Sequence, residues 1–190
     1  LTWCAPTWKG GGYNWASGNV FHHMYAKHYP SAVSTAEYLA ENHESLLKRI
    51  LAWQEVIYAD GNLPVWLRGS LINILYTLTE TSFWAQKKSP LPGWVLEEDG
   101  LFGMNECPRD CPQIECIPCT WYGNQPIVYF FPELSRSTLV AYKHLQRENG
   151  QIPFTLNGLQ VGRPYMSVAG YYWQKSLNST CYVHLVDRQW

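Results

Sequence analysis

The chain has 190 residues, and its 14 basic and 15 acidic residues leave a net charge of −1, which excludes the basic surface that nucleic-acid binding requires. Charged residues make up only 15% of the chain, so we expect much of its surface to be covered by the remainder of its own polypeptide. No apolar run reaches the roughly 18 residues of a transmembrane segment. The chain opens on Leu1 and closes on Trp190 within a helical pattern, and we expect it to be a fragment.

Residues 1–33 are interpreted as the end of an upstream β domain and a linker. Ser34-Thr35-Ala36-Glu37 then has the form of a capping box, in which a hydroxyl and a Glu three residues later satisfy the first amides of a helix. The sequence therefore predicts a long amphipathic helix over residues 34–58. Its apolar positions share one face and are Leu39, Leu46, Ile50, Trp53 and Ile57.

The rest of the chain is predicted to be helical, with one strand at most. Pro64 suits the first turn of a second helix, which is expected to run to about Trp84. Asp99 to Met104 is interpreted as a turn with a short strand. Further helices are predicted over 126–131, over 135–147 and from about Ser167, with a Gly- and Pro-rich loop over 149–165. The fold class is therefore mainly α.

Four cysteines in 13 residues form a loop, at Cys107, Cys111, Cys116 and Cys119. Four thiolates suit tetrahedral zinc, but the spacing lacks the paired C-x2-C halves of zinc sites. We favour two local disulfides over zinc, which implies a secreted or extracytoplasmic protein, and no metal is predicted. The glycosylation pattern at Asn178 is compatible with that location.

Several phrases, in this order, resemble the catalytic region of glycoside hydrolase family 116, which includes the bile-acid β-glucosidases. They are Leu1-Thr2-Trp3, Ala36 to Trp53, Leu63 to Leu67, Asp99-Gly100-Leu101-Phe102-Gly103, Phe131-Pro132-Glu133-Leu134 and Gly150-Gln151-Ile152-Pro153. The resemblance implies a β-sandwich, of which 1–33 would be the end, followed by an (α/α)6 barrel, of which 34–190 would be the N-terminal part. It also implies a retaining hydrolase of β-linked sugars that needs no cofactor.

The resemblance places the catalytic nucleophile at Glu106, just before the cysteine loop. A retaining glycosidase uses two carboxyl groups about 5 Å apart, one as nucleophile and one as acid/base. Arg109 and the amide of Asn105 are close enough in sequence to keep Glu106 ionised. Glu115 is the competing candidate. In the family the acid/base lies well downstream, which here means beyond residue 190.

Substrate-binding positions follow from the same resemblance. Thr120, Trp121 and Asn124 come where the family gathers sugar-contacting groups at a helix start, although Thr and Asn there also suit helix capping. Asp187 matches a recurring Asp of a later inner helix, and an outward, solvated Asp is the alternative. Each of these four residues is a predicted sugar contact.

One departure bears on the substrate. Where the better-studied β-glucosidases of the family carry a His-Asp pair that holds the sugar, this chain has Phe154-Thr155. A sugar other than glucose, such as xylose or N-acetylglucosamine, is then expected. The alternative functions are a non-catalytic carbohydrate-binding or structural protein with the same fold, and a zinc-stabilised interaction module built on the cysteines.

Overall fold

The computed structural model describes residues 2–9, 20–89, 91–107, 111–156 and 175–189, and it is mainly helical, as predicted. In chain order the elements are β1 (Thr7–Lys9), β2 (Val20–His22), η1 (Met24–Lys27), α1 (Ala32–Tyr58), α2 (Val65–Asn73), η2 (Ile74–Tyr76), α3 (Thr77–Glu80), β3 (Ser82–Ala85), β4 (Leu101–Cys107), β5 (Cys111–Ile114), α4 (Ile117–Gly123), α5 (Gln125–Phe130), α6 (Pro132–Leu145) and α8 (Lys175–Gln189). Within the described helices, no segment is both long and apolar enough to cross a bilayer.

The prediction of one strand at most was wrong. Five strands are described, in an antiparallel pair β1-β2 and an antiparallel sheet of order β3-β4-β5. The predicted second helix ends at Glu80, and Trp84 lies in β3 opposite Phe102 of β4. The adjacent aromatic residues Phe83 and Trp84 favour a strand once a partner strand is present.

Residues of β2 and of the turn after it pack against the central sheet. Gln86 donates from its backbone N–H to His22 O at 2.8 Å, and its side-chain amide donates to His23 O at 2.9 Å. The rings of Phe21 and Phe83 meet edge to face at 5.6 Å. Thr2 and Trp3 precede β1 and lie in no strand.

Helix α1 begins three residues earlier than the predicted capping box and ends at Tyr58 as expected. The Ser31 hydroxyl accepts from the Ser34 N–H at 3.1 Å, and the Ser34 hydroxyl accepts from the Ser31 N–H at 3.2 Å. This reciprocal pair caps the helix one turn earlier than the expected box of Ser34 and Glu37.

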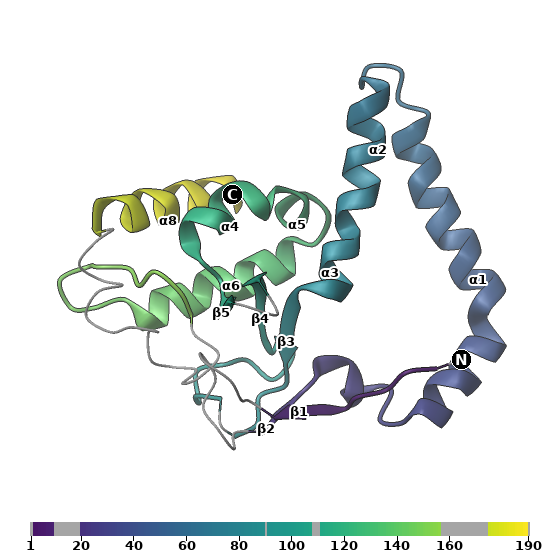
Figure 1. Cartoon of the computed structure of the whole chain (residues 1–190), viewed down its shortest axis with the longest axis horizontal. Coiled ribbons are helices and arrows are strands. Elements are labelled where there is room, and N and C mark those ends of the chain that lie inside the picture. Colours follow the sequence, from purple (N-terminus) through teal and green to yellow (C-terminus); the bar gives the residue numbers. More distant parts are fainter. Residues whose placement is uncertain (1, 10–19, 90, 108–110, 157–174, 190) are drawn as a thin grey trace.

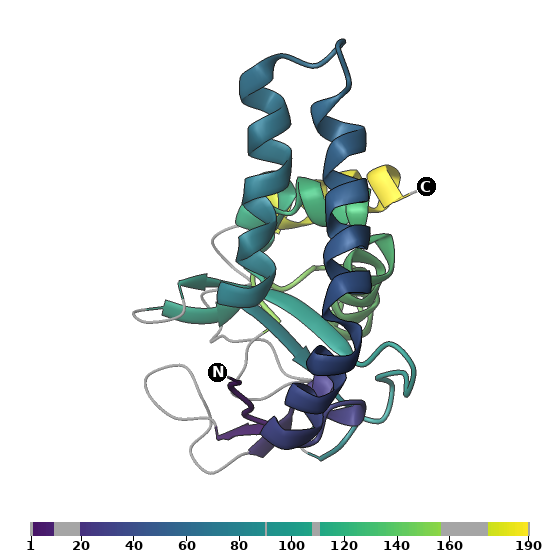
Figure 2. The ribbon, with the colours of Figure 1, turned by 90° about the vertical axis from the view of Figure 1, so that its right-hand side faces the viewer.

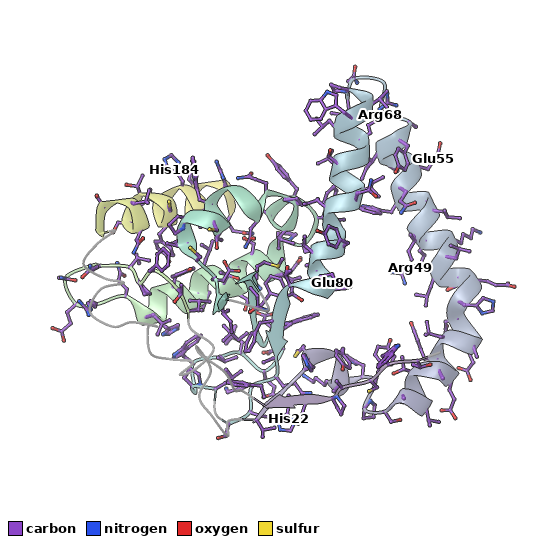
Figure 3. The ribbon with its side chains drawn as sticks, viewed as in Figure 1. His22, Arg49, Glu55, Arg68, Glu80 and His184 are labelled. Atoms are coloured by element: carbon purple, nitrogen blue, oxygen red, sulfur yellow. The ribbon has the colours of Figure 1, made fainter. Side chains whose placement is uncertain are left out.

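Helices α1 and α2 form an antiparallel hairpin whose tip projects beyond the rest of the chain (Figures 1 and 2). The Trp53 ring of α1 meets Phe130 of α5 edge to face at 5.4 Å. Arg68, near the tip of the hairpin in Figure 3, donates to Tyr58 O at 2.6 Å and so fastens the two helices together. No residue of α1 is buried. Of its predicted apolar face, Leu39 and Ile50 are exposed, and the other three residues are half-buried. Val65 and Trp66 of α2 are 76% and 70% exposed.

The hydrophobic core lies where β4 packs on α6, with α8 against α4 and α6 (Figure 1). Its buried residues come from the sheet, from α4, α6 and α8 and from the segment after α6, and include Phe21, Phe83, Leu101, Ile114, Ile117, Leu139, Tyr142, Ile152, Leu156 and Leu185. The core therefore fixes the β4-β5 hairpin against α4. This is the region where the sequence places its candidate carboxylates.

Candidate functional site

The β4-β5 hairpin carries both candidate carboxylates. Asn105 of β4 pairs with Ile114 of β5, and Cys107 pairs with Cys111. The two β4 residues are two positions apart and their β5 partners are three positions apart, so the register shifts between these pairs. Glu106 lies in β4 at this irregularity, and its side chain is outside the described part of the chain. Irregular pairing of this kind is common beside active sites because it redirects the strand. The prediction for Glu106 stays a prediction.

Glu115, directly after β5, is held in an unusual conformation. Its φ is +55°, a region that non-glycine residues seldom occupy, and its side chain is only 1% exposed. The Tyr142 hydroxyl of α6 donates to the Glu115 backbone carbonyl at 2.8 Å and so stabilises the turn between β5 and α4. A strained, buried carboxyl group is a candidate functional residue because the fold maintains it at a cost.

Three donors surround the Glu115 carboxylate. The Met104 N–H donates to Oε1 at 2.6 Å. The Asn124 amide donates to both oxygens, at 3.2 and 3.4 Å, and the Thr120 hydroxyl donates to Oε2. Thr120 lies within α4 and Asn124, four residues later, caps its C-terminal end, so both side chains lie on the same side of the helix and reach the carboxylate. The structure thus brings two predicted sugar contacts together on the competing acid.

Burial raises the pKa of Glu115 from 4.5 to about 7, because a desolvated carboxyl group resists ionisation. The hydrogen bonds from Thr120, Met104 and Asn124 act in the opposite direction and favour the ionised form. Burial beside the same carboxylate raises the pKa of Tyr142 well above its ordinary value. Glu115 therefore changes its charge close to neutral pH, as groups at functional sites often do.

A pocket of about 360 Å³ opens beside this cluster. Its lining comes from η2, α3, β4 and the region of α4, and consists of Ile74, Thr77, Met104, Asn105, Cys116, Cys119, Thr120, Gly123 and Asn124. No Asp or Glu of the described residues lines it. Glu115 therefore lies behind the pocket wall, while the groups that it holds form part of that wall.

Trp121 and Asp187 lie apart from the pocket. The Trp121 ring of α4 lies under the Arg188 guanidinium, 5.5 Å from it, and 6.3 Å from the ring of His184, which points outward from α8 in Figure 3. Asp187 is exposed on α8. Successive residues of a helix point about 100° apart, so Trp121 faces away from the cluster that its neighbour Thr120 joins. Neither residue contacts Glu115.

The segment that contains Phe154 and Thr155 runs directly beside Glu115. Leu156 donates to Ile114 O at 2.8 Å, and Ile117 donates to Phe154 O at 2.9 Å. Thr155 bridges to Cys116, is 1% exposed, and its hydroxyl has no hydrogen-bond partner within the described chain. Phe154 and Thr155 therefore form part of the immediate surroundings of the acidic cluster.

The cysteine loop lies partly outside the described side chains. Cys116 caps α4, and Cys119 follows within that helix. Among the residues that the structure describes, no group of three His, Cys, Asp or Glu side chains is arranged to hold a metal ion. Disulfides within the loop remain a prediction.

The glycosylation pattern at residue 178 falls on a buried side chain. Asn178 is 0% exposed within α8, and its amide donates to Ile152 O at 3.3 Å. A glycan on this nitrogen does not fit the folded chain. The pattern therefore gives no support to a secreted location.

Gly103 of β4 makes room for Glu115. A Cβ at this position would lie 2.6 Å from Ile114 Cγ2 and 3.0 Å from Glu115 Cγ. We expect Gly103→Ala to lower the free energy of unfolding by about 1–3 kcal/mol through overpacking, as measured by urea denaturation. Gly93→Ala is the control, because its Cβ would meet nothing within 4 Å. Equal stability of the two variants would contradict this packing.

Sequence reasoning alone missed two residues of the cluster, Gly103 and Tyr142. A Gly within a predicted strand signals a close approach of another group, and this signal was present. Tyr142 gave no such signal, since its hydroxyl meets the Glu115 carbonyl across 27 residues of sequence.

Comparison with known proteins provides no family for this chain. A scan against models of protein families finds no match, and a search of curated proteins finds none either. The candidate site consequently depends on its own geometry: a buried carboxylate that organises a threonine and an asparagine on the wall of a pocket, beside a strand that carries a second acid.

Proposed function

We propose that the chain carries the nucleophile side of a retaining β-glycosidase site. Glu106 is the nucleophile, and the acid/base comes from the same polypeptide beyond residue 190. Thr120 and Asn124 contact the sugar. The observation that supports this proposal best is the hydrogen-bonded cluster of Glu115, Thr120 and Asn124, which fixes two neutral polar groups at the wall of a 360 Å³ pocket.

The position of Glu106 supports its assignment over Glu115. The register irregularity of β4 falls at Glu106 itself, where the regular alternation of side chains between the two faces of the sheet is interrupted. Glu115 instead is 1% exposed and its oxygens already accept from three donors. A carboxylate that attacks carbon needs an uncovered lone pair, so Glu115 suits a positioning role better.

The chemistry of such a site is a double displacement. A carboxylate oxygen of Glu106 attacks the anomeric carbon while the bond from that carbon to the leaving oxygen breaks and the acid protonates the leaving oxygen. Water then attacks the glycosyl-enzyme, gives its proton to the same group, and releases Glu106. Two inversions give net retention. Hydrogen bonds from the pocket wall orient the ring so that the attack is in line.

The same proposal extends to the fold, with the described helices forming the first part of an (α/α)6 barrel. The exposed apolar residues of α1 and α2, among them Ile50, Val65 and Trp66, support it. Exposed apolar surface of this extent is characteristic of faces that another element covers. Further helices of the same polypeptide would provide that cover.

The substrate is proposed to be a β-linked sugar other than glucose. Thr155 is buried and Phe154 offers an aromatic ring where a charged pair would grip the outer hydroxyls of glucose. Loss of such hydrogen-bonding partners changes which sugar is accepted. Xylosides and N-acetylglucosaminides are therefore the first substrates to try.

The test uses the complete polypeptide with 4-nitrophenyl β-glycosides of glucose, xylose and N-acetylglucosamine. Proton NMR during the reaction should show the β-anomer of the released sugar first, before mutarotation. Release of the α-anomer would contradict retention. Binding of the sugars without any release would favour the non-catalytic carbohydrate-binding alternative.

A further inference from the structure

The Glu115 cluster has a consequence for ligand chemistry because it occupies the hydrogen-bond donors of the pocket wall. The Thr120 hydroxyl has one proton, and its two acceptors are Glu115 Oε2 and the Cys116 carbonyl at 3.1 Å. While Glu115 is ionised, above a pH of about 7, no proton of this hydroxyl is left to donate into the pocket. Its oxygen can only accept from a ligand.

The donor group of Asn124 is also directed at Glu115. Its side-chain nitrogen lies 3.2 and 3.4 Å from the two oxygens of Glu115. The amide oxygen is on the opposite branch of the planar group and so points away from the carboxylate. The Glu115 carboxylate thus selects one of the two possible orientations of the Asn124 amide. In that orientation the Asn124 side-chain oxygen is directed away from Glu115 and is available as an acceptor.

Asn105 is a third residue of the pocket that has an acceptor without a donor in the described part of the chain. It lines the pocket from β4, and its Oδ1 is buried with no hydrogen-bond partner among the described residues. A buried acceptor without a donor carries a desolvation cost until a donor arrives. The described lining contains no Lys, Arg or His that could supply one.

We propose that Glu115 is a positioning residue that makes this pocket an acceptor-lined subsite, which recognises a ligand through hydroxyl groups that donate. The proposal rests on the proposed function, in which the ligand is a β-linked sugar. Hydroxyl groups of the sugar would donate hydrogen bonds to Thr120 Oγ1 and Asn105 Oδ1, which then act as acceptors. A sugar in which the recognised hydroxyl cannot donate should bind poorly.

The experiment measures donation directly. Methyl 1-thio-β-glycosides of glucose, xylose and N-acetylglucosamine resist hydrolysis, and each has analogues in which a single hydroxyl is replaced by fluorine, which cannot donate. Calorimetric titration of the complete polypeptide should show, for the best-bound sugar, about a 10-fold loss of affinity for fluorine at one ring position. Glu115→Gln should reduce that discrimination to less than about 3-fold. The NH2 group of the glutamine would face one of the three donors that now bind the carboxylate, and the two donors cannot bond to each other.

A second pair of variants keeps the test independent of whether Glu115→Gln folds. Thr120→Val removes the acceptor and should abolish discrimination at the same ring position, whereas Thr120→Ser retains the hydroxyl and should restore it. Glu133→Gln, at an exposed position of α6, is the matched control and should behave as the parent protein.

The outcomes separate the two proposals. If a thioglycoside binds but fluorine is tolerated at every position, or if Thr120→Val keeps the discrimination, the acceptor-lined subsite is wrong and the glycosidase proposal stands. If no thioglycoside binds, the proposed function fails and the subsite proposal fails with it.

Discussion

Replacing Glu106 by glutamine in the complete polypeptide should lower kcat for an aryl β-glycoside by about 10⁴-fold or more, the scale seen when a catalytic nucleophile is removed. Gln is isosteric with Glu but cannot form the glycosyl ester, so binding of the sugar should persist while turnover is lost. Steady-state kinetics with the best 4-nitrophenyl glycoside provide the measurement.

Two matched substitutions make this result specific. Glu133→Gln changes an exposed carboxylate of α6 and should leave kcat unchanged. Glu115→Gln should raise KM and lower kcat/KM by about 10- to 100-fold, as expected when groups that orient a substrate are misplaced. If kcat of the Glu106→Gln enzyme is within 10-fold of the parent value and the Glu115→Gln enzyme is inactive, the nucleophile is Glu115 and not Glu106.

The second large effect concerns stability and pH. Glu115 has a pKa of about 7 in the folded chain and 4.5 as the ordinary value, so between these values the folded state binds a proton that the unfolded state has released. The free energy of unfolding should therefore fall as the pH rises from about 4.5 to about 7. A difference of this size corresponds to about 3 kcal/mol.

Glu115→Gln should remove this part of the pH dependence, since an amide does not titrate. The difference between parent and variant also cancels the contribution of the six histidines, which titrate in a similar range. Urea denaturation at several pH values between 4 and 8 provides both curves. A parent protein whose stability rises through this range relative to the variant would show that Glu115 is ionised more easily in the folded state than in water.

Local patterns predicted the helices well where capping and periodicity act alone. Helix α1 ends at Tyr58 as predicted, and α5 and α6 fall within three residues of the predicted 126–131 and 135–147. The error at the start of α1 arose because Ser31 and Ser34 form a reciprocal pair that uses a second serine in place of a Glu. Such a pair has no strong sequence signature.

Pairing between distant segments could not be predicted in the same way. Trp84 belongs to β3 only because β4, about 18 residues later, supplies a partner strand. Before that partner is known, its residues continue the apolar pattern of the preceding helix. The same limit applies to the site: the four-residue spacing of Thr120 and Asn124 was visible, but their common partner Glu115 depends on how β5 meets α4.

The most direct measurement is to map a covalent sugar label. The complete polypeptide is incubated with cyclitol epoxides of gluco, xylo and N-acetylglucosamine configuration, then reduced, and digested with trypsin. Cleavage after Arg109 separates peptide 89–109, which contains Glu106, from peptide 110–136, which contains Glu115. We expect the added mass on Glu106 in the first peptide. An adduct on the second peptide, or on neither, would contradict the assignment of the nucleophile to β4.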